Sequence, residues 1–231
     1  MKQSLLALSI ALLSGNAIAN DAFNFDYVGA GYGKIKIDDS YSDESFNGFA
    51  IETSKKINDS WVISAQYLNT SRDYTKQYYY HRYTGAEVTG KTNVDLDVEQ
   101  FNLGAAYLIE LDESSVLELA AHIGRLNLES TTMGEELEVL DNVESVTSYT
   151  YGGKAHNSTY GLNVNYHYAF SDSFSAEAGI GYERINDAEQ ENEFVYQLGL
   201  NYNITPDFTI SALYRNVDVY QNHQVTLRYN F

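Results

Sequence analysis

Apolar and polar residues alternate along most of this chain with a period of two, as in β-strands that face an apolar environment on one side. The clearest example begins at Tyr160, where Leu162 and Val164 share one face and Gly161 and Asn163 share the other. The polar face of such segments holds mostly Gly, Asn, Ser and Gln, with few of the charges expected on a water-facing sheet. This composition is typical of a confined barrel interior.

Ten segments of this kind are long enough to cross the apolar part of a membrane as tilted strands. They cover Phe25–Ile37, Ser45–Lys56, Ser60–Asp73, Val94–Ile109, Val116–Glu129, Ser158–Phe170, Phe174–Asn186, Glu193–Ile204, Phe208–Val219 and His223–Phe231. An even number of strands brings both ends of the chain to one side of the membrane. We therefore predict an all-β fold, a transmembrane antiparallel up-and-down β-barrel of ten strands. The alternative is eight strands with one hairpin outside the membrane.

Connections of different length are expected at the two ends of this barrel. Short turns lie at Ile57–Asp59, Glu110–Ser115, Ser171–Ser173 and Thr205–Asp207, beside the aromatic residues Trp61, Tyr107, Phe170, Phe174, Tyr202 and Phe208. Longer connections are predicted at Asp38–Glu44, Tyr74–Asn93, Ser130–Asn157 and Asp187–Asn192, with a short one near Tyr220–Asn222. Short periplasmic turns, longer outside loops and aromatic girdles are typical of outer-membrane barrels.

One predicted strand changes its phase. Val94, Leu96 and Val98 alternate on the face opposite to that of Phe101 and the apolar residues after it. This change predicts either a β-bulge near Glu99–Gln100 or a strand that extends above the membrane.

The first nineteen residues have the features of a secretory signal peptide. Lys2 provides a positive start, Leu5–Leu13 form a short apolar run, and Ala17 and Ala19 give the small residues of a cleavage site. We expect residues 1–19 to be removed and residues 20–231 to form the barrel domain.

Composition narrows the classes of function. The 231 residues include 32 acidic and 14 basic side chains, and a net charge of −18 argues against a nucleic-acid partner. The absence of cysteine excludes disulfides, thiolate metal sites and cysteine catalysis. We expect no cofactor and no bound metal. The mean hydropathy is only −0.36 because a lipid-exposed strand needs just every second residue to be apolar.

The final strand ends on phenylalanine and alternates apolar residues at Val225, Leu227, Tyr229 and Phe231. This pattern resembles the C-terminal assembly signal of outer-membrane β-barrels, and Tyr27–Gly33 resembles the first strand of the OmpA-like, porin-like small barrel families of Gram-negative bacteria. The resemblance implies location in the outer membrane, recognition by the barrel-assembly machinery, and contact with outer-membrane lipid and lipopolysaccharide. It leaves the function open, because these families include anchors, narrow channels, adhesins and a few enzymes.

Ionisable residues at inward positions are the first candidate site: Glu52, Glu118, His122, His167, Glu177, Glu183, Arg215 and Arg228. We favour ion pairs and hydrogen bonds that fill the interior, since a barrel of ten strands is only somewhat wider than one filled by side chains. A narrow ion path with cation preference is the alternative.

Aromatic and basic residues interleave in and beside the second long connection, at Arg72, Tyr74, Tyr78, Tyr79, Tyr80, Arg82 and Tyr83. Tyrosines provide rigid amphipathic contact area, and the cations suit anionic sugars or phosphates. These residues therefore either bind an extracellular ligand, a host surface or lipopolysaccharide, or belong to the outer aromatic girdle.

Two short patterns raise the possibility of an outer-rim hydrolase. Asp95–Asp97, together with Asp218 and His223, resembles the site of the omptin proteases, but the Asp-x-His pattern of that family is missing. His156–Ser158 resembles the His-x-Ser of the lipid A deacylase, without its following asparagine and spaced glutamate.

We expect a non-enzymatic outer-membrane barrel whose extracellular loops serve surface binding, adhesion or envelope stabilisation. A porin-like narrow channel with cation preference is the first alternative. An outer-rim hydrolase, either a lipid A deacylase or an omptin-like protease, is the second.

Overall fold

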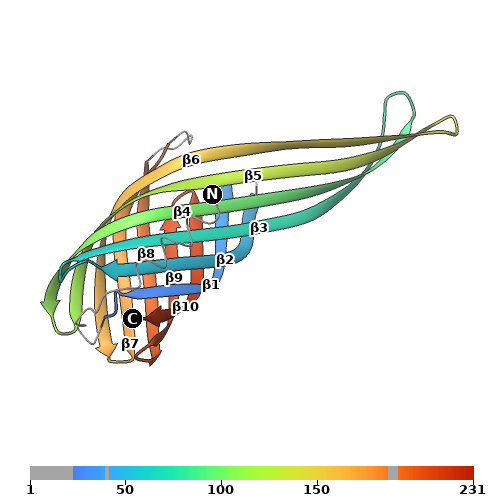
Figure 1. Ribbon diagram of the computed structural model, residues 1–231. Coiled ribbons are helices and arrows are strands. Elements are labelled where there is room, and N and C mark those ends of the chain that lie inside the picture. The colour runs from blue at the N-terminus through green and yellow to red at the C-terminus, as the bar shows by residue number, and fades with distance from the viewer. Residues whose placement is uncertain (1–22, 40–41, 187–191) are drawn as a thin grey trace.

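The computed structural model describes residues 23–39, 42–186 and 192–231, which form one closed antiparallel barrel (Figure 1). Each strand pairs with its neighbours in sequence, and β1 pairs with β10. The strands are β1 Tyr27–Asp39, β2 Ser42–Lys56, β3 Trp61–His81, β4 Glu87–Asp112, β5 Ser115–Leu140, β6 Val143–Ser171, β7 Phe174–Ile185, β8 Asn192–Thr205, β9 Phe208–Val217 and β10 Tyr220–Asn230. The ten-stranded all-β prediction is confirmed, and the eight-stranded alternative is wrong. Within the described ranges no helix is long and apolar enough to cross a membrane.

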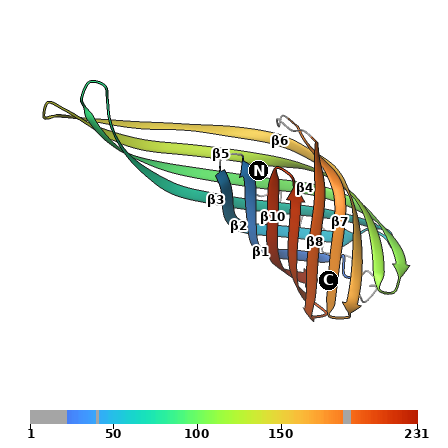
Figure 2. The same ribbon diagram turned by 180° about the vertical axis from the view of Figure 1, so that it is seen from behind.

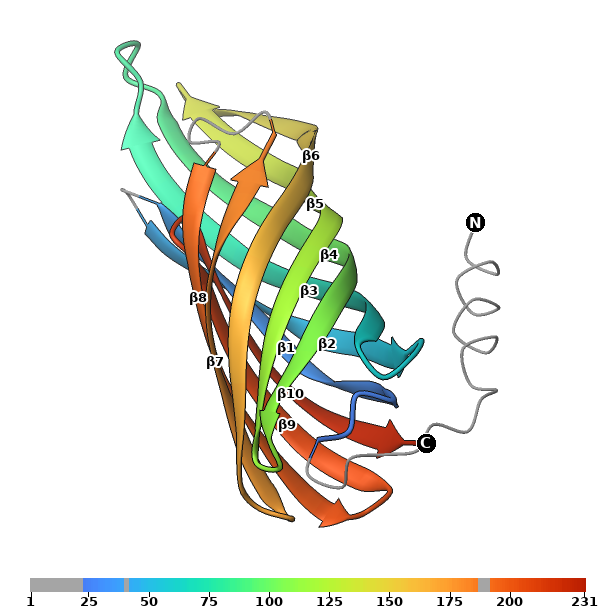
Figure 3. The same ribbon diagram turned by 90° about the vertical axis from the view of Figure 1, so that its left-hand side faces the viewer.

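The alternation in the sequence corresponds to the two faces of the barrel wall. On β6, the side chain of Leu162 is 66% exposed on the outside, whereas its neighbour Asn163 is 8% exposed and faces the interior. Aromatic rings on the outside pair across strands near the short turns: the centroids of Trp61 and Tyr107 lie 5.3 Å apart. Figure 3 shows how the strands wind steeply around the barrel. The expected aromatic rim beside the short turns is present.

Strands β3 to β6 continue far beyond the barrel as a four-stranded sheet, which we call the blade (Figures 1 and 2). The blade comprises residues 72–96 and 130–153. Its strands separate from the barrel where β2 stops pairing with β3 at Ser71 and where β7 stops pairing with β6 at Thr159. Within the blade, main-chain pairing runs without a register shift from barrel to tip.

The blade corrects two predictions, because Tyr74–Asn93 and Ser130–Asn157 are mostly strand and not loop. These stretches lack an apolar face, yet they are rich in residues that favour strands, and main-chain hydrogen bonds do not require apolar side chains. The second hairpin closes in a two-residue turn in which Asp141 and Asn142 have φ of 52° and 63°. Such left-handed conformations match the twist of a hairpin.

The predicted bulge near Glu99–Gln100 is also wrong. Pairing of β3 with β4 is continuous there, and β4 simply extends above the membrane, as the other interpretation proposed. The phase changes because Val98 points inward and is 1% exposed. Two predicted strand ends were also wrong. The first strand begins at Tyr27 and not at Phe25, and β10 begins at Tyr220, so the turn before it precedes the connection predicted near Tyr220–Asn222.

Apolar side chains form two layers inside the barrel, one towards each end. The outer apolar layer consists of Ile35, Phe46, Ala50, Leu68, Val98, Leu126, Ile185, Val195, Val217 and Tyr220. Leu68 on β3 reaches past Ala50 on β2 to β1 because Gly33 leaves it room: a Cβ atom at Gly33 would lie 2.1 Å from Leu68 Cδ1. The inner apolar layer consists of Val62, Ala106, Leu108 and Val116, against which Phe23, Phe25 and Ala120 pack.

Some predictions fall on residues that the structure does not describe. The predicted signal peptide at residues 1–19 lies outside the described ranges, as do residues 40–41 and 187–191 within two of the predicted longer connections. Cleavage after residue 19, and the domain boundary at residue 20, therefore stay predictions.

Candidate functional site

A bidentate ion pair forms the first part of the polar interior, between the two apolar layers. Arg228 on β10 donates to Glu52 on β2 from Nε to Oε1 over 2.8 Å and from Nη2 to Oε2 over 3.0 Å. Thr226 also donates to Glu52, and Arg228 Nη1 donates to Asn201 over 3.1 Å. The guanidinium lies 4.1 Å from the ring centroid of Tyr27. Both charges are therefore fully engaged in polar contacts.

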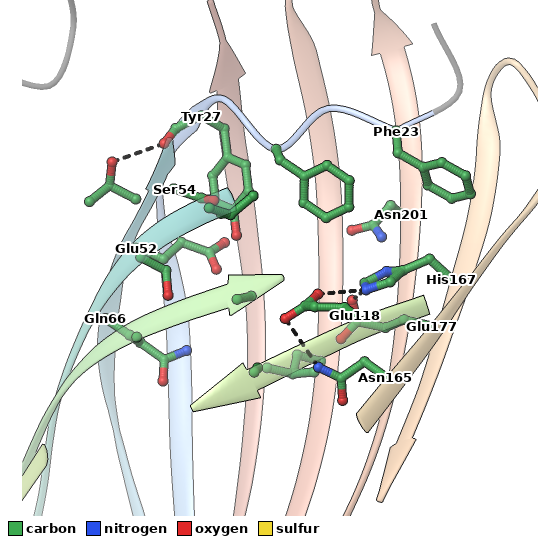
Figure 4. Close-up of a pocket in the computed structure, with 18 of the residues that line it drawn as sticks. Phe23, Tyr27, Glu52, Ser54, Gln66, Glu118, Asn165, His167, Glu177 and Asn201 are labelled. Carbon is green, nitrogen blue, oxygen red and sulfur yellow. Dashed lines mark hydrogen bonds and ion pairs between the residues drawn. The ribbon is translucent and has the colours of Figure 1, made fainter. Parts of the chain in front are cut away.

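A second cluster lies beside it and joins two glutamates through one imidazole (Figure 4). His167 Nε2 is 2.7 Å from Glu118 Oε2, and His167 Nδ1 is 3.4 Å from Glu177 Oε2. The ring of Phe25 contacts His167 edge-on, with centroids 5.6 Å apart. Because the N-terminal segment places Phe23 and Phe25 over this imidazole, the cluster is covered from the periplasmic end.

The third cluster surrounds Glu183, which is completely buried. Arg215 Nη2 donates to Glu183 Oε2 over 2.7 Å, and His122 Nε2 lies 2.9 Å from the same oxygen. The Tyr220 hydroxyl donates to Glu183 Oε1 over 2.8 Å, and Gln100 donates to that hydroxyl over 2.9 Å. Tyr220 thus links this cluster to the outer apolar layer.

All eight predicted lumen residues point inward, and the structure brings them together in these three clusters. A polar cavity of about 240 Å³ remains among them, and its lining includes Phe25 and Val62 of the inner apolar layer. Hydrophobic constrictions impede ion passage by expelling water. This geometry supports the filled interior over the narrow ion path.

A conductance measurement checks this arrangement. Wild-type protein in planar bilayers is expected to show no discrete conductance steps, because the outer apolar layer excludes water. The variant Ile35→Ser/Leu68→Ser/Val98→Ser hydrates that layer and is expected to conduct, provided that it retains heat-modifiable gel migration. Steps of constant size in the wild type would show that the lumen is open.

A tyrosine platform occupies the face of the blade that continues the lumen side of the barrel. The Tyr78 ring covers Gly90, where a Cβ atom would lie 2.2 Å from Tyr78 Cζ, and Tyr149 covers Gly134 in the same way at 2.1 Å. The two hydroxyl groups are 3.2 Å apart, and that of Tyr78 donates to Glu136 over 2.8 Å. Hydrogen bonds with Tyr149 and Glu136 raise the pKa of Tyr78 above its ordinary value.

Further rings and cations extend the platform on both sides. Tyr151 stacks on Tyr149 with centroids 5.9 Å apart, and Tyr80 stacks on Tyr78 at 6.1 Å. Arg72 and Lys76 lie over the ring of Tyr74, at 5.4 Å and 5.1 Å from its centroid. The platform therefore combines the residues Arg72, Tyr74, Lys76, Tyr78, Tyr80, Tyr149 and Tyr151.

The predicted loop-binding residues do not all lie on the same face of the blade. Arg72, Tyr74, Tyr78 and Tyr80 belong to the platform, and Arg82 lies at its tip, 3.6 Å from Glu136 and from Glu138. Tyr79 points to the opposite face, where its ring contacts His81, and Tyr83 is fully exposed in the turn. Tyr149 and Tyr151 were not among the predicted residues, although their spacing of two residues places them on one face of a strand.

The C-terminal residues face the surrounding lipid. Val225, Leu227 and Tyr229 are each about half exposed on the outside of β10. Phe231 follows β10 and stacks on Tyr229, with Lys55 Nζ 4.8 Å from the centroid of its ring. This placement leaves the apolar outward face of the last strand accessible, and recognition by the assembly machinery stays a prediction.

The residues that suggested a hydrolase do not assemble. Asp97 lies on the outside of β4, opposite Glu129 across the β4–β5 pair. His223 is on β10, which is not adjacent to β4, so no pair of the omptin kind forms between them. His156 Nδ1 donates to Asn127 Oδ1 over 2.8 Å on the outside of the wall. Among the described residues, no group of three or more acidic or histidine side chains is placed to hold a metal ion.

Comparison with known proteins gives a family match over the C-terminal part of the chain. Residues 124–231 match the family model described as the outer membrane protein beta-barrel domain. The outer membrane protease OmpT from Escherichia coli is similar in structure, with 12% identity, a TM-score of 0.50, and coverage of 94% of this chain and 100% of OmpT. At this identity, the similarity concerns the fold alone.

Two further solved structures are less similar. Ail, the attachment invasion locus protein of Yersinia pestis, has 15% identity and a TM-score of 0.36, covering 89% of this chain and 97% of Ail. An outer membrane channel from Pseudomonas putida F1 has 10% identity and a TM-score of 0.45, covering 94% of this chain and 100% of the channel. A comparison with curated protein sequences gives no match.

Proposed function

Because this chain is a ten-stranded outer-membrane β-barrel, we propose that it is a non-enzymatic surface protein whose blade binds glycans presented outside the cell. The tyrosine platform carries this proposal. Its rings lie on a continuous sheet beyond the membrane, where a partner can reach them.

The platform has the chemistry that sugar recognition requires. Exposed aromatic rings offer flat apolar faces for the C–H faces of a sugar, and tyrosine adds a hydroxyl that hydrogen-bonds to sugar hydroxyl groups. Tyr151 is 62% exposed, so its ring is available even though it stacks on Tyr149. Arg72 and Lys76 add donors beside Tyr74. Arg82 lies 3.6 Å from both Glu136 and Glu138 and offsets one of their two charges. The remaining carboxylate charge does not oppose an uncharged sugar, since its oxygens accept hydrogen bonds from hydroxyl groups.

The rigidity of the platform also favours binding. The rings of Tyr78 and Tyr149 rest on glycine backbone, their hydroxyl groups are hydrogen-bonded to each other, and the Tyr78 hydroxyl donates to Glu136. Both rings are therefore held in place before a ligand arrives. Preorganised contact groups lose little conformational entropy on binding. The filled barrel interior is consistent with a role at the surface and not in transport.

Single substitutions on the two faces of the blade test the proposal. Tyr74→Ala and Tyr151→Ala are each expected to weaken binding to a glycan array by about 3–10-fold, because each removes an aromatic contact face. Tyr79→Ala removes a similar ring from the opposite face and serves as the matched control. Equal loss for all three variants, or no binding by the wild type, would argue against a platform that recognises sugars.

A further inference from the structure

The blade has two open edges, whereas the closed barrel below it has none (Figures 1 and 2). Because β2 stops pairing with β3 at Ser71 and β7 stops pairing with β6 at Thr159, β3 and β6 become the outer strands of the blade. Among the described residues, each of these outer strands then has a partner strand on one side only. An outer strand with unpaired main-chain groups is a template for a further strand.

Even-numbered residues of β6 direct their main-chain groups to its open edge. Just below the blade, where β7 is still present, the carbonyl oxygen of Ser158 accepts a hydrogen bond from the main-chain N–H of Asn186 over 2.9 Å. Alternate residues of a strand direct their main-chain groups to the same side, so the even-numbered residues from 144 to 156 point the same way. In the blade, no described strand receives these groups. The open edge of β6 is about 50 Å long.

The two open edges differ in their protection against strand pairing. The β3 edge carries Arg72, Asp73 and Lys76, and charged side chains, lysine above all, discourage pairing with another chain. The β6 edge from Ser145 to Gly153 holds no charged residue and no proline, and its valine, threonine and tyrosine residues favour strands. The pairing of β6 with β5 has no register shift that would bend this edge away. The β6 edge is therefore the one suited to the addition of a strand.

Two charged residues flank this uncharged stretch symmetrically. Glu144 lies five residues before Tyr149, and Lys154 lies five residues after it. When two copies of β6 pair antiparallel about Tyr149, each Glu144 lies opposite the other copy's Lys154, and the two Tyr149 side chains lie opposite each other. Opposite charges and aromatic pairs directly across two strands stabilise the pairing. Lys154 contacts Glu129 but is 60% exposed, so its ammonium group can reach a second carboxylate. Any other register separates the charges.

We propose that the β6 edge of the blade pairs antiparallel with the β6 edge of a second copy of this chain on a facing cell. Blades in one membrane all point the same way, so neighbours in that membrane present parallel strands, whereas copies in two facing membranes present antiparallel ones. The contact is one continuous sheet with a two-fold axis at Tyr149. This axis is perpendicular to the sheet, so both tyrosine platforms lie on the same face and stay exposed. The contact therefore holds whether or not the blade binds glycans.

Clustering of phosphatidylcholine vesicles tests this contact in the absence of any glycan. Two vesicle populations with different dyes each receive the full-length protein, reconstituted from detergent in both orientations, and fluorescence cross-correlation counts the two-colour clusters that the wild type is expected to form. Glu144→Lys alone and Lys154→Glu alone are each expected to lower clustering at least about 5-fold, because both flanking charge pairs become repulsive. Glu144→Lys vesicles mixed with Lys154→Glu vesicles are expected to cluster as the wild type does, since opposite charges again face each other.

Proline variants test the edge itself, with heat-modifiable gel migration as the check on folding. Ser148→Pro removes an N–H that points to the open edge of β6 and is expected to abolish clustering. On β3, the N–H of Arg82 donates to Ala86 on the β4 side, so odd-numbered residues face the open edge. The control, Gln77→Pro, therefore removes such an N–H from the β3 edge and is expected to cluster as the wild type does. The proposal is overturned if wild-type vesicles stay separate, if both proline variants cluster equally, or if mixing the two charge variants restores nothing.

Discussion

Replacing Arg228 by methionine is expected to destabilise the folded barrel by about 3–5 kcal/mol. Glu52 is 7% exposed and receives two hydrogen bonds from this guanidinium, so its carboxylate would stay buried without its cation. Removal of one partner of a buried ion pair is far more costly than removal of an exposed charge, because the remaining ion cannot return to water. Arg228 also contacts Asn201 and the Tyr27 ring, and both contacts would be lost.

Urea titration of the protein folded in lipid vesicles measures this effect. The double variant Glu52→Gln/Arg228→Met removes both charges and is expected to recover a large part of the lost stability. Arg125→Met removes an arginine from the outside of β5 and is expected to change the free energy of unfolding by less than about 1 kcal/mol. If Arg228→Met and Arg125→Met have equal effects, the interior is hydrated and the ion pair is not buried.

The barrel wall was predictable from the sequence because lipid imposes a strict rule on its outer face. Every second residue on β6 between Tyr160 and Phe170 is apolar, and the structure places all of these side chains outside. The inward phase of Glu183 and Arg215 follows from the same rule. The contact between Glu183 and Arg215 could not be predicted, because the two residues lie on β7 and β9, which do not pair with each other. Which inward side chains meet depends on the width of the lumen, and the sequence does not give that width.

The blade was not predictable by the same rule, because neither of its faces is buried in lipid. Tyr149 and Tyr151 alternate within a polar stretch that resembles an ordinary loop. Their partners are Gly134 and Thr132 on β5, and these pairs follow from the hairpin turn at Asp141–Asn142. Similarly, the phase change at Val98 is caused by the apolar layer inside the lumen. The sequence showed the change of phase but not its cause.

Removal of the blade is the second change with a large expected effect. Arg72 and Leu96 are directly opposed on β3 and β4, as are Ser130 and Gly153 on β5 and β6. Replacing residues 73–95 and 131–152 each by an Asn-Gly turn therefore closes two short hairpins above the membrane without altering the barrel register. The expected product is a folded barrel with an intact ion-pair network and no tyrosine platform.

Glycan binding by this shortened barrel, compared with the full-length protein on one array, tests most directly whether the blade is the functional surface. Both proteins should show heat-modifiable gel migration, which establishes that each barrel is folded. We expect the full-length protein to bind a subset of glycans and the shortened barrel to bind none of them. If the shortened barrel retains the same glycans, the blade is not the binding surface.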